Sequence, residues 1–398
     1  MSAPQSPMAP KIPLSSSLRP GIKPLQRASS LLLTAGLLLA GSLQAQSGKD
    51  QVGWVDKSGR AKTFTGIITE NTLERTVIQV GDTERRVDSD AVTLVSFGAV
   101  PPAYGEGVAY FDRSDFSTAA ARFQVAATDA SASESVKAAA RFRAGQAWMR
   151  AGAQSSDAFI NAVDQLERFV SDNPANRSLP LATYYLGRAK WLGGDPQAAA
   201  DLLRGLFQNR ATAGYPAVVC YQAGTVAAQA LIAAGDPASA KSLFAEVQPA
   251  LASHLASLDS TDSQRYKLSN LEADALLGEG FCLLAEDKAS QAKSFFSSKL
   301  SSADHSTALS YGARLGLAES QLTLGETRAA QLDFAKVSAL DHSSNDRVAR
   351  AMLGLAECAL KLPDSASNQD AKLLLESIQD QFGDTPSVLR AAELLKSL

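Results

Sequence analysis

Small and bulky apolar residues recur in one order seven times between Gly107 and Ile378. Each copy has a small residue, a bulky residue three positions later, a turn, and then an Ala followed four positions later by an aromatic residue or a Leu. These spacings place the apolar side chains on the facing sides of two antiparallel helices. The small residue lets the helices approach closely, and the Phe or Leu fills the gap to the next pair. The pattern therefore predicts a stack of helical hairpins, none of which buries its apolar face alone.

The copies differ in length. Their second-helix alanines are separated by 43, 37, 41, 52, 38 and 41 residues, so we expect irregular repeats with loop insertions. The sequence Leu-Gly-Leu-Ala-Glu at 315–319 returns at 353–357, which indicates repetition independently. The residues that carry the pattern are Gly107, Tyr110, Phe116, Ala119, Phe123 and Ala126; Ala162, Leu166 and Phe169; Gly187, Gly194, Ala199, Leu203 and Leu206; Ala228, Leu231, Gly235, Ala240, Phe244 and Val247; Gly280, Leu283, Ala292 and Phe296; Ala318, Gly325, Ala330, Phe334 and Val337; and Ala356, Ala371, Leu375 and Ile378.

These motifs resemble the tetratricopeptide repeat family, whose unit is a helical hairpin of 34 residues. The resemblance covers roughly residues 103–398 and is specific for the fold. It implies a mostly α protein, a right-handed superhelical α-solenoid of about seven hairpins within 101–398 that ends in a capping helix. It says little about function, because hairpins of this kind are general docking surfaces.

Residues 1–45 have the pattern of a secretory signal peptide. Four basic residues and no acidic residue precede an apolar run from Leu31 to Leu43, and the small residue Ala45 follows. Such a run is too short to span a bilayer comfortably. We therefore predict cleavage near Ala45 and export to the periplasm or outside the cell. An uncleaved membrane anchor and an organellar transit peptide are the alternatives.

Between Gln51 and Gly98 the hydrophobic period changes from helical to alternating. This predicts a small all-β module within 46–100, with a turn at Gly81-Asp82. Its apolar set is modest, so we expect the module to pack against the first helical hairpin. Pro101-Pro102 then ends the strands and starts the helices. Of the four or five strands expected, four have clear bounds: Thr63–Ile68, Thr76–Val80, Glu84–Val87 and Val92–Phe97.

Composition agrees with packed helices, since 45% of residues are hydrophobic and only 7% are aromatic. The net charge of −3 becomes −7 once the leader removes four of the 38 basic residues and none of the 41 acidic ones. An acidic chain without a basic patch excludes nucleic acid as an expected partner. After cleavage of the leader we expect no membrane span, and self-association stays possible.

Reactive chemistry is hard to find in the sequence. His254, His305 and His342 are isolated in polar, loop-like stretches without metal-ligand spacing, so we expect neither a metal nor a cofactor. Three cysteines, at 220, 282 and 358, lie in first-helix positions and are expected to be buried, although one disulfide between neighbouring hairpins is an alternative.

Two short matches resemble serine penicillin-recognising enzymes, S-x-x-K at 290–293 and S-D-N at 171–173, but their order is reversed and K-T-G is absent. We expect Ser290 instead to cap a helix start, and Ser171 to Asn173 to lie where another helix stops. The chain is therefore predicted not to be an enzyme.

The resemblance also implies which residues line the concave groove. In the family, the inner wall carries first-helix residues at the fifth, ninth, twelfth and thirteenth positions. Aromatic residues beside Arg are typical anchors of protein contacts, whereas packing between repeats and solvation are the alternatives. Carried over to this sequence, the protein-binding candidates are Tyr104, Phe111, Phe142, Gln146, Arg150, Tyr184, Arg188 and Trp191, with Val108, Asp112 and Met149 beside them.

The sequence thus favours an exported, non-enzymatic scaffold that binds partner proteins or peptides in a superhelical groove, in the organisation of the cell envelope. A second hypothesis is a cell-wall or glycan-binding protein, in which the β module recognises the ligand and the repeats act as a spacer.

Overall fold

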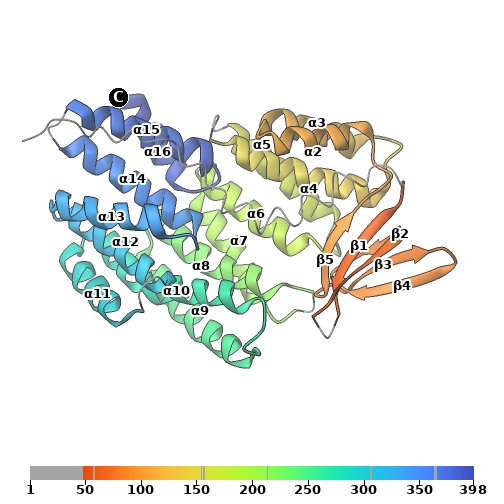
Figure 1. The fold of residues 1–398 in the computed structure, drawn as a ribbon, viewed down its shortest axis with the longest axis horizontal. Helices are drawn as coiled ribbons and strands as arrows, with labels where there is room; N and C mark the ends of the chain where they lie inside the picture. The colour runs from red at the N-terminus through yellow and green to blue at the C-terminus, as the bar shows by residue number, and fades with distance from the viewer. Residues whose placement is uncertain are drawn as a thin grey trace, which may run out of the picture. The chain divides into compact units, whose positions relative to one another are not determined.

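The computed structural model describes residues 48–56, 59–153, 155, 157–212, 214–304, 307–362 and 365–398. The predicted leader, 1–45, lies outside the described residues. In the described part, a five-stranded antiparallel sheet precedes fifteen helices (Figure 1). None of the described helices combines the length and the apolar character that a membrane crossing would require.

The sheet has the strand order β4-β3-β2-β1-β5, and all its pairs are antiparallel. Val52, Ile68 and Ile78 are buried on its inner face. A two-residue turn at Gly81-Asp82, with Gly81 at φ +59°, joins β3 to β4 as predicted. The first strand was not delimited by the sequence pattern. The strands are β1 (Asp50–Val55), β2 (Ala61–Asn71), β3 (Arg75–Val80), β4 (Thr83–Asp88) and β5 (Val92–Ser96).

The helices pair in sequence as seven hairpins, and a last helix follows, which confirms the predicted solenoid-like stack. Each helix packs mainly on the helices that precede and follow it. The hairpins are α2 (Pro102–Asp112) with α3 (Phe116–Thr128), α4 (Glu134–Ala151) with α5 (Asp157–Asp172), α6 (Leu179–Leu192) with α7 (Pro196–Gln208), α8 (Ala217–Ala233) with α9 (Pro237–Ser257), α10 (Arg265–Ala285) with α11 (Ala289–Ser302), α12 (Ala308–Thr323) with α13 (Thr327–Leu340), and α14 (Asn345–Lys361) with α15 (Ser365–Gln381); α16 (Ser387–Ser397) is the last.

Glycines on the first helices make room for the aromatic residues of the second helices. A Cβ added to Gly280 would lie 2.4 Å from Cζ of Phe296, in the same hairpin. A Cβ on Gly316, in the next hairpin, would lie 2.3 Å from the same ring. Phe296 is fully buried because both neighbours lack a side chain at the point of contact. The pattern of small and bulky residues therefore sets the packing both within and between hairpins.

The junction between the sheet and the helices differs from the prediction of contact with the first hairpin. The hydrogen bonds instead tie the sheet to the loop between α5 and α6, with Leu73 N donating to Ala175 O at 2.8 Å and Arg177 N donating to Asn71 O at 3.2 Å. The Arg177 guanidinium also donates to the carbonyls of Ser89 and Val92. Unpaired backbone groups at the β2–β3 turn and in this loop satisfy one another, which the hydrophobic pattern cannot reveal.

Candidate ligand-binding cavity

A cavity of about 950 Å³ lies among the first helices of the hairpins. Its walls come from α6, α8, α10, α12, α14 and the start of α16, together with the loops before α14 and α16. Second helices contribute little to the lining, because their apolar faces pack into the neighbouring hairpins. The volume is near the upper end of the range typical of small-ligand sites, about 300–1,000 Å³.

One wall of the cavity is largely apolar. It contains Val218, Val226 and Ile232 of α8 and Leu271 and Phe281 of α10. These side chains are only partly covered by the protein, apart from the buried Val226. A ligand that covers them would gain roughly 25 cal/mol for each Å² of apolar surface removed from water.

A second wall of the cavity carries paired charges. Arg350 of α14 donates to both carboxylate oxygens of Glu319 on α12, at 3.1 and 2.7 Å. Its guanidinium also lies 4.5 Å from the ring centroid of Phe281 on α10. Burial raises the pKa of Glu319, and Arg350 opposes that shift. One side chain thus connects three successive hairpins along the wall.

Arg347 makes a second connection of this kind and is itself buried. Its guanidinium donates to Asp341 at 2.8 Å and to Asp274 of α10. The side chain passes Gly312 of α12, where a Cβ would lie 3.7 Å from its Cδ. Burial raises the pKa of Asp274, while the attraction of Arg347 lowers it. Because each carboxylate faces the same guanidinium, this wall is electrostatically satisfied without a ligand.

Arg188 closes the cavity where distant parts of the array meet. Its guanidinium donates to the Tyr184 hydroxyl at 3.2 Å, to Asp346 at 3.2 Å, and to the Asp384 carbonyl. Arg150 of α4 pairs with the Asp384 carboxylate at 3.3 Å. We call this set of contacts, from Arg150, Tyr184 and Arg188 to Asp346 and Asp384, the seam.

Apolar contacts accompany the seam. Val388 of α16 is buried in the same cluster as Phe142 of α4 and Leu186 of α6. A Cβ on Gly383 would lie 2.5 Å from Cβ of Ala153, so the chain before α16 approaches the end of α4 very closely. In a repeat array each unit ordinarily contacts only its neighbours. The seam is an exception, because it joins the second and third hairpins to the seventh and to the last helix.

The structure brings two of the predicted groove residues, Arg188 and Trp191, into the lining of the cavity. Tyr184 is buried beneath Arg188, and burial raises the pKa of its hydroxyl to about 12. Arg150 lies at the seam. These positions favour the predicted register in the third unit, and a role in binding stays a prediction.

The other candidates lie away from this lining. Tyr104 packs edge-on against Phe123, with ring centroids 5.4 Å apart, and Phe111 packs in the same way against Phe116 at 5.2 Å. Phe142 is buried against Phe169, and Gln146 is half-buried on α4. Of their neighbours in the prediction, Met149 is buried, Val108 is half-buried, and Asp112 is exposed.

Sequence reasoning missed the residues of α8, α10, α12 and α14 that form most of the lining. The repeat pattern could have indicated these residues, since first-helix positions were expected to face inward. The prediction extended that register only through the third unit. Arg347 and Arg350 had no such signal, because their partners lie on other helices.

The residues singled out for chemistry are placed as follows. Cys220, Cys282 and Cys358 are buried and free, and burial raises the pKa of each thiol to about 11. His342 lies in the exposed loop before α14, whereas His254 lies in α9 rather than in a loop, with its ring 5.4 Å from Tyr221. His305 lies outside the described residues. In the described part of the chain, no three His, Cys, Asp or Glu side chains gather as a metal site would require.

The expected helix cap at Ser290 is wrong. The N-cap position of α11 is Lys288, and Ser290 lies inside the helix with an exposed side chain. Lys293, the last residue of the S-x-x-K match, pairs with Glu326. Asn173 does lie at the end of α5, where its amide donates to Phe169 O at 3.0 Å.

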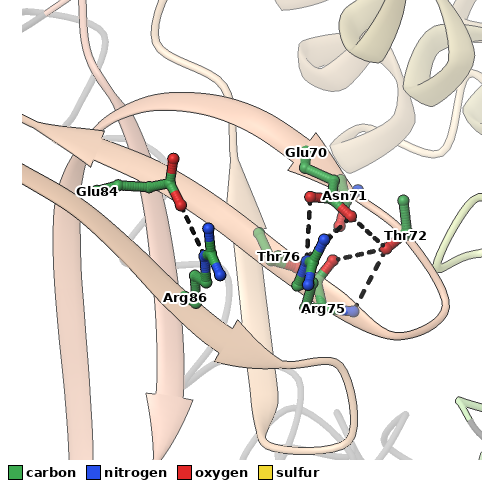
Figure 2. Close-up of polar contacts among 7 residues, drawn as sticks. All are labelled: Glu70, Asn71, Thr72, Arg75, Thr76, Glu84 and Arg86. Atoms are coloured by element: carbon green, nitrogen blue, oxygen red, sulfur yellow. Dashed lines mark hydrogen bonds and ion pairs between the residues drawn. The ribbon is translucent and has the colours of Figure 1, made fainter.

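The polar groups of the sheet mostly hold the sheet together. Figure 2 shows Arg75 of β3 donating to Glu70 at 3.1 Å and Thr72 donating to the same carboxylate. The buried Thr76 hydroxyl donates to Asn71 at 3.1 Å, and Arg86 pairs with Glu84. The contacts between Glu70 and Thr76 fix the turn that meets the α5–α6 loop. They therefore serve the fold of the module, and the cavity is the better candidate site.

No protein-family model matches this chain, and no curated protein matches its sequence. Among solved structures, it is similar to a tetratricopeptide repeat protein from Parabacteroides merdae, with 13% identity, a TM-score of 0.45, and coverage of 74% of this chain and 96% of that one. It is also similar to the apo quorum sensor NprR from B. thuringiensis, with 13% identity, a TM-score of 0.41, and coverage of 74% and 80%. A kinesin light chain from Podospora anserina with TPR-like repeats is 19% identical, with a TM-score of 0.33 and coverage of 50% and 94%.

Proposed function

We propose that this protein is a scaffold that binds a polypeptide segment of a partner in the cavity between its first helices. The observation that carries the proposal is the lining itself, in which a partly covered apolar wall adjoins a network of paired charges. Binding sites of this composition combine apolar area for affinity with a few fixed polar groups for orientation. A wall that spans five hairpins suits a chain segment better than a compact metabolite.

Steric blocking tests the proposal. Ala233 of α8 and Ala285 of α10 are exposed and line the cavity, so Ala233→Trp and Ala285→Trp fill it without disturbing buried packing. Ala335→Trp, at an exposed position on the second helix α13, is the matched control. Peptides selected from a random library on the wild-type protein should lose at least about tenfold in affinity with either cavity variant, because a filled site excludes the ligand, and should be unaffected by the control. Equal binding by all four proteins would place the ligand elsewhere.

We further propose that the protein acts in the cell envelope after export. The basic start, short apolar run and small residue of 1–45 support this. The amino terminus of the protein recovered from its native cells should lie near residue 46, and the protein should fractionate with periplasmic or secreted material. An intact leader on a protein of the cytosolic fraction would contradict the proposal.

A further inference from the structure

We propose that the cavity recognises its ligand by hydrogen bonds to the ligand's main chain. We further propose that this ligand is an extended, uncharged and largely apolar polypeptide segment. This inference rests on the proposed function and specifies its partner. It depends on which groups in the lining already have partners and which do not.

The anionic side chains of the lining are already paired. Its carboxylates belong to Asp274, Glu319, Asp346 and Asp384, and their cations are Arg347, Arg350, Arg188 and Arg150. A basic ligand residue would have to displace one of these partners. Breaking such a pair in a partly buried place leaves a charge uncompensated, which is unfavourable.

Most cationic side chains of the lining are also in ion pairs. Arg390 pairs with Glu357 and Glu393, and the other three arginines are those of the pairs above. Among the described residues, Lys267 is the one lining Lys or Arg without an ion-pair partner, and it is exposed. An acidic ligand therefore finds no preformed cluster of free guanidinium groups.

Three half-buried amide side chains of the lining are also free. Gln222 and Gln229 of α8 and Asn270 of α10 are half-buried, and none of the three makes a hydrogen bond to another described residue. A carboxamide both donates and accepts, so it matches the N–H and C=O of a peptide unit and cannot select for charge. These amides can therefore pair with the backbone of a ligand whatever its side chains.

The spacing on α8 suits an extended chain. Gln222 and Gln229 are seven residues apart, two helical turns, so they share a face at about 10 Å along the axis. An extended peptide covers that distance in about three residues, at roughly 3.3 Å per residue. Val218 and Val226 lie four positions before and after Gln222 and also line the cavity. Amide and apolar groups thus alternate along one stripe, which fits main-chain contacts alternating with apolar side chains.

The experiment uses the full chain and peptides selected from a random library on the wild-type protein. The variants Gln222→Leu and Gln229→Leu keep the volume but lose the amide, and should weaken binding about tenfold each, as expected for the loss of a paired hydrogen bond in a half-buried site. Gln291→Leu, at an exposed position of α11, is the control and should bind like the wild type. Lys267→Met tests for a charged ligand, because it removes the unpaired cation of the lining. Unchanged thermal midpoints establish that the variants are folded.

Two readouts on the ligand do not require a variant protein. Methylation of single backbone nitrogens in the selected peptide should lower affinity about tenfold at the paired positions. Raising the salt concentration should change affinity less than about twofold, because no new ion pair forms. Charged peptides whose binding fails in salt or with Lys267→Met would overturn the inference, as would Gln variants that bind like the wild type. If the wild-type protein binds no peptide at all, the proposed function itself fails.

Discussion

In the first and third hairpins, the turn between the two helices contains one residue with a left-handed backbone. Gly194 has φ +99°, whereas the corresponding residue of the first hairpin is Ser114, with φ +62°. The following Asp caps the second helix in both hairpins, with Asp195 accepting from Ala198 N at 3.0 Å and Asp115 accepting from Thr118 N at 3.3 Å. Gly adopts this left-handed backbone without strain, whereas Ser does not, so the two hairpins form the same turn with residues that suit it unequally.

Opposite effects should follow from exchanging these residues. Gly194→Ala should lower the free energy of unfolding by about 1 kcal/mol, because a Cβ is strained at positive φ. Ser114→Gly should raise it by a few tenths of a kcal/mol, since relief of strain slightly exceeds the entropy cost of Gly. Urea unfolding measures both. Changes of the same sign in the two variants would contradict this account of the turn.

The buried cysteines predict a loss of stability at alkaline pH. Burial raises each thiol pKa from an ordinary value of 9.0 to about 11. Above pH 9 the unfolded chain ionises its thiols while the folded chain does not, so the free energy of unfolding should fall as the pH rises toward 11. At pH 8 the native thiols should resist alkylation that is rapid in urea. Rapid labelling of the native protein would show that the three sites are accessible.

At the scale of the element, the close contact between hairpins depends on missing side chains. A Cβ on Gly354 of α14 would lie 2.3 Å from Phe334 of α13. Gly354→Ala should therefore destabilise the protein by about 1–3 kcal/mol through overpacking. Gly205→Ala, in α7 where a Cβ meets nothing within 4 Å, should instead stabilise it by up to about 1 kcal/mol. Urea unfolding distinguishes the two, and a stabilised Gly354→Ala would mean that the hairpins are not in close contact there.

Much of this element scale could be predicted from the sequence. Helical period, small residues and turn signals act locally, so Gly280 and Phe296 indicated a hairpin without knowledge of the rest. The site was predicted less well. Arg188 and Trp191 line the cavity, whereas Tyr104 and Phe111 pack within their own hairpin. An aromatic side chain can line a cavity or pack inside a hairpin, and its spacing in the sequence alone does not decide between the two.

At the scale of the described repeat array, the seam could not be predicted. A repeat pattern records contacts between neighbours, whereas Arg188 reaches Asp346, 158 residues away, and the carbonyl of Asp384, 196 residues away. Which distant units meet depends on small rotations summed over several hairpins. The lengths of the inserted loops change those rotations without leaving a hydrophobic signature.

The seam makes a prediction about stability. Arg188→Met removes three hydrogen bonds and leaves Asp346 without its cation, so it should cost about 1–3 kcal/mol in urea unfolding. It should also speed thermolysin cleavage between residues 382 and 388. Arg141→Met breaks the exposed pair with Asp172 inside the second hairpin and should cost less than about 1 kcal/mol. Equal effects of the two variants would mean that the seam adds nothing to the array.

The central claim is that ligands enter among the first helices, and hydrogen exchange with a library-selected peptide tests it most directly. Binding should slow exchange in α6, α8 and α10 and in the segments 341–346 and 382–388, which contain Asp346 and Asp384 of the seam. It should leave the second helices and the sheet at 50–96 unchanged. Protection confined to the sheet or to second helices such as α11 and α13 would contradict the account.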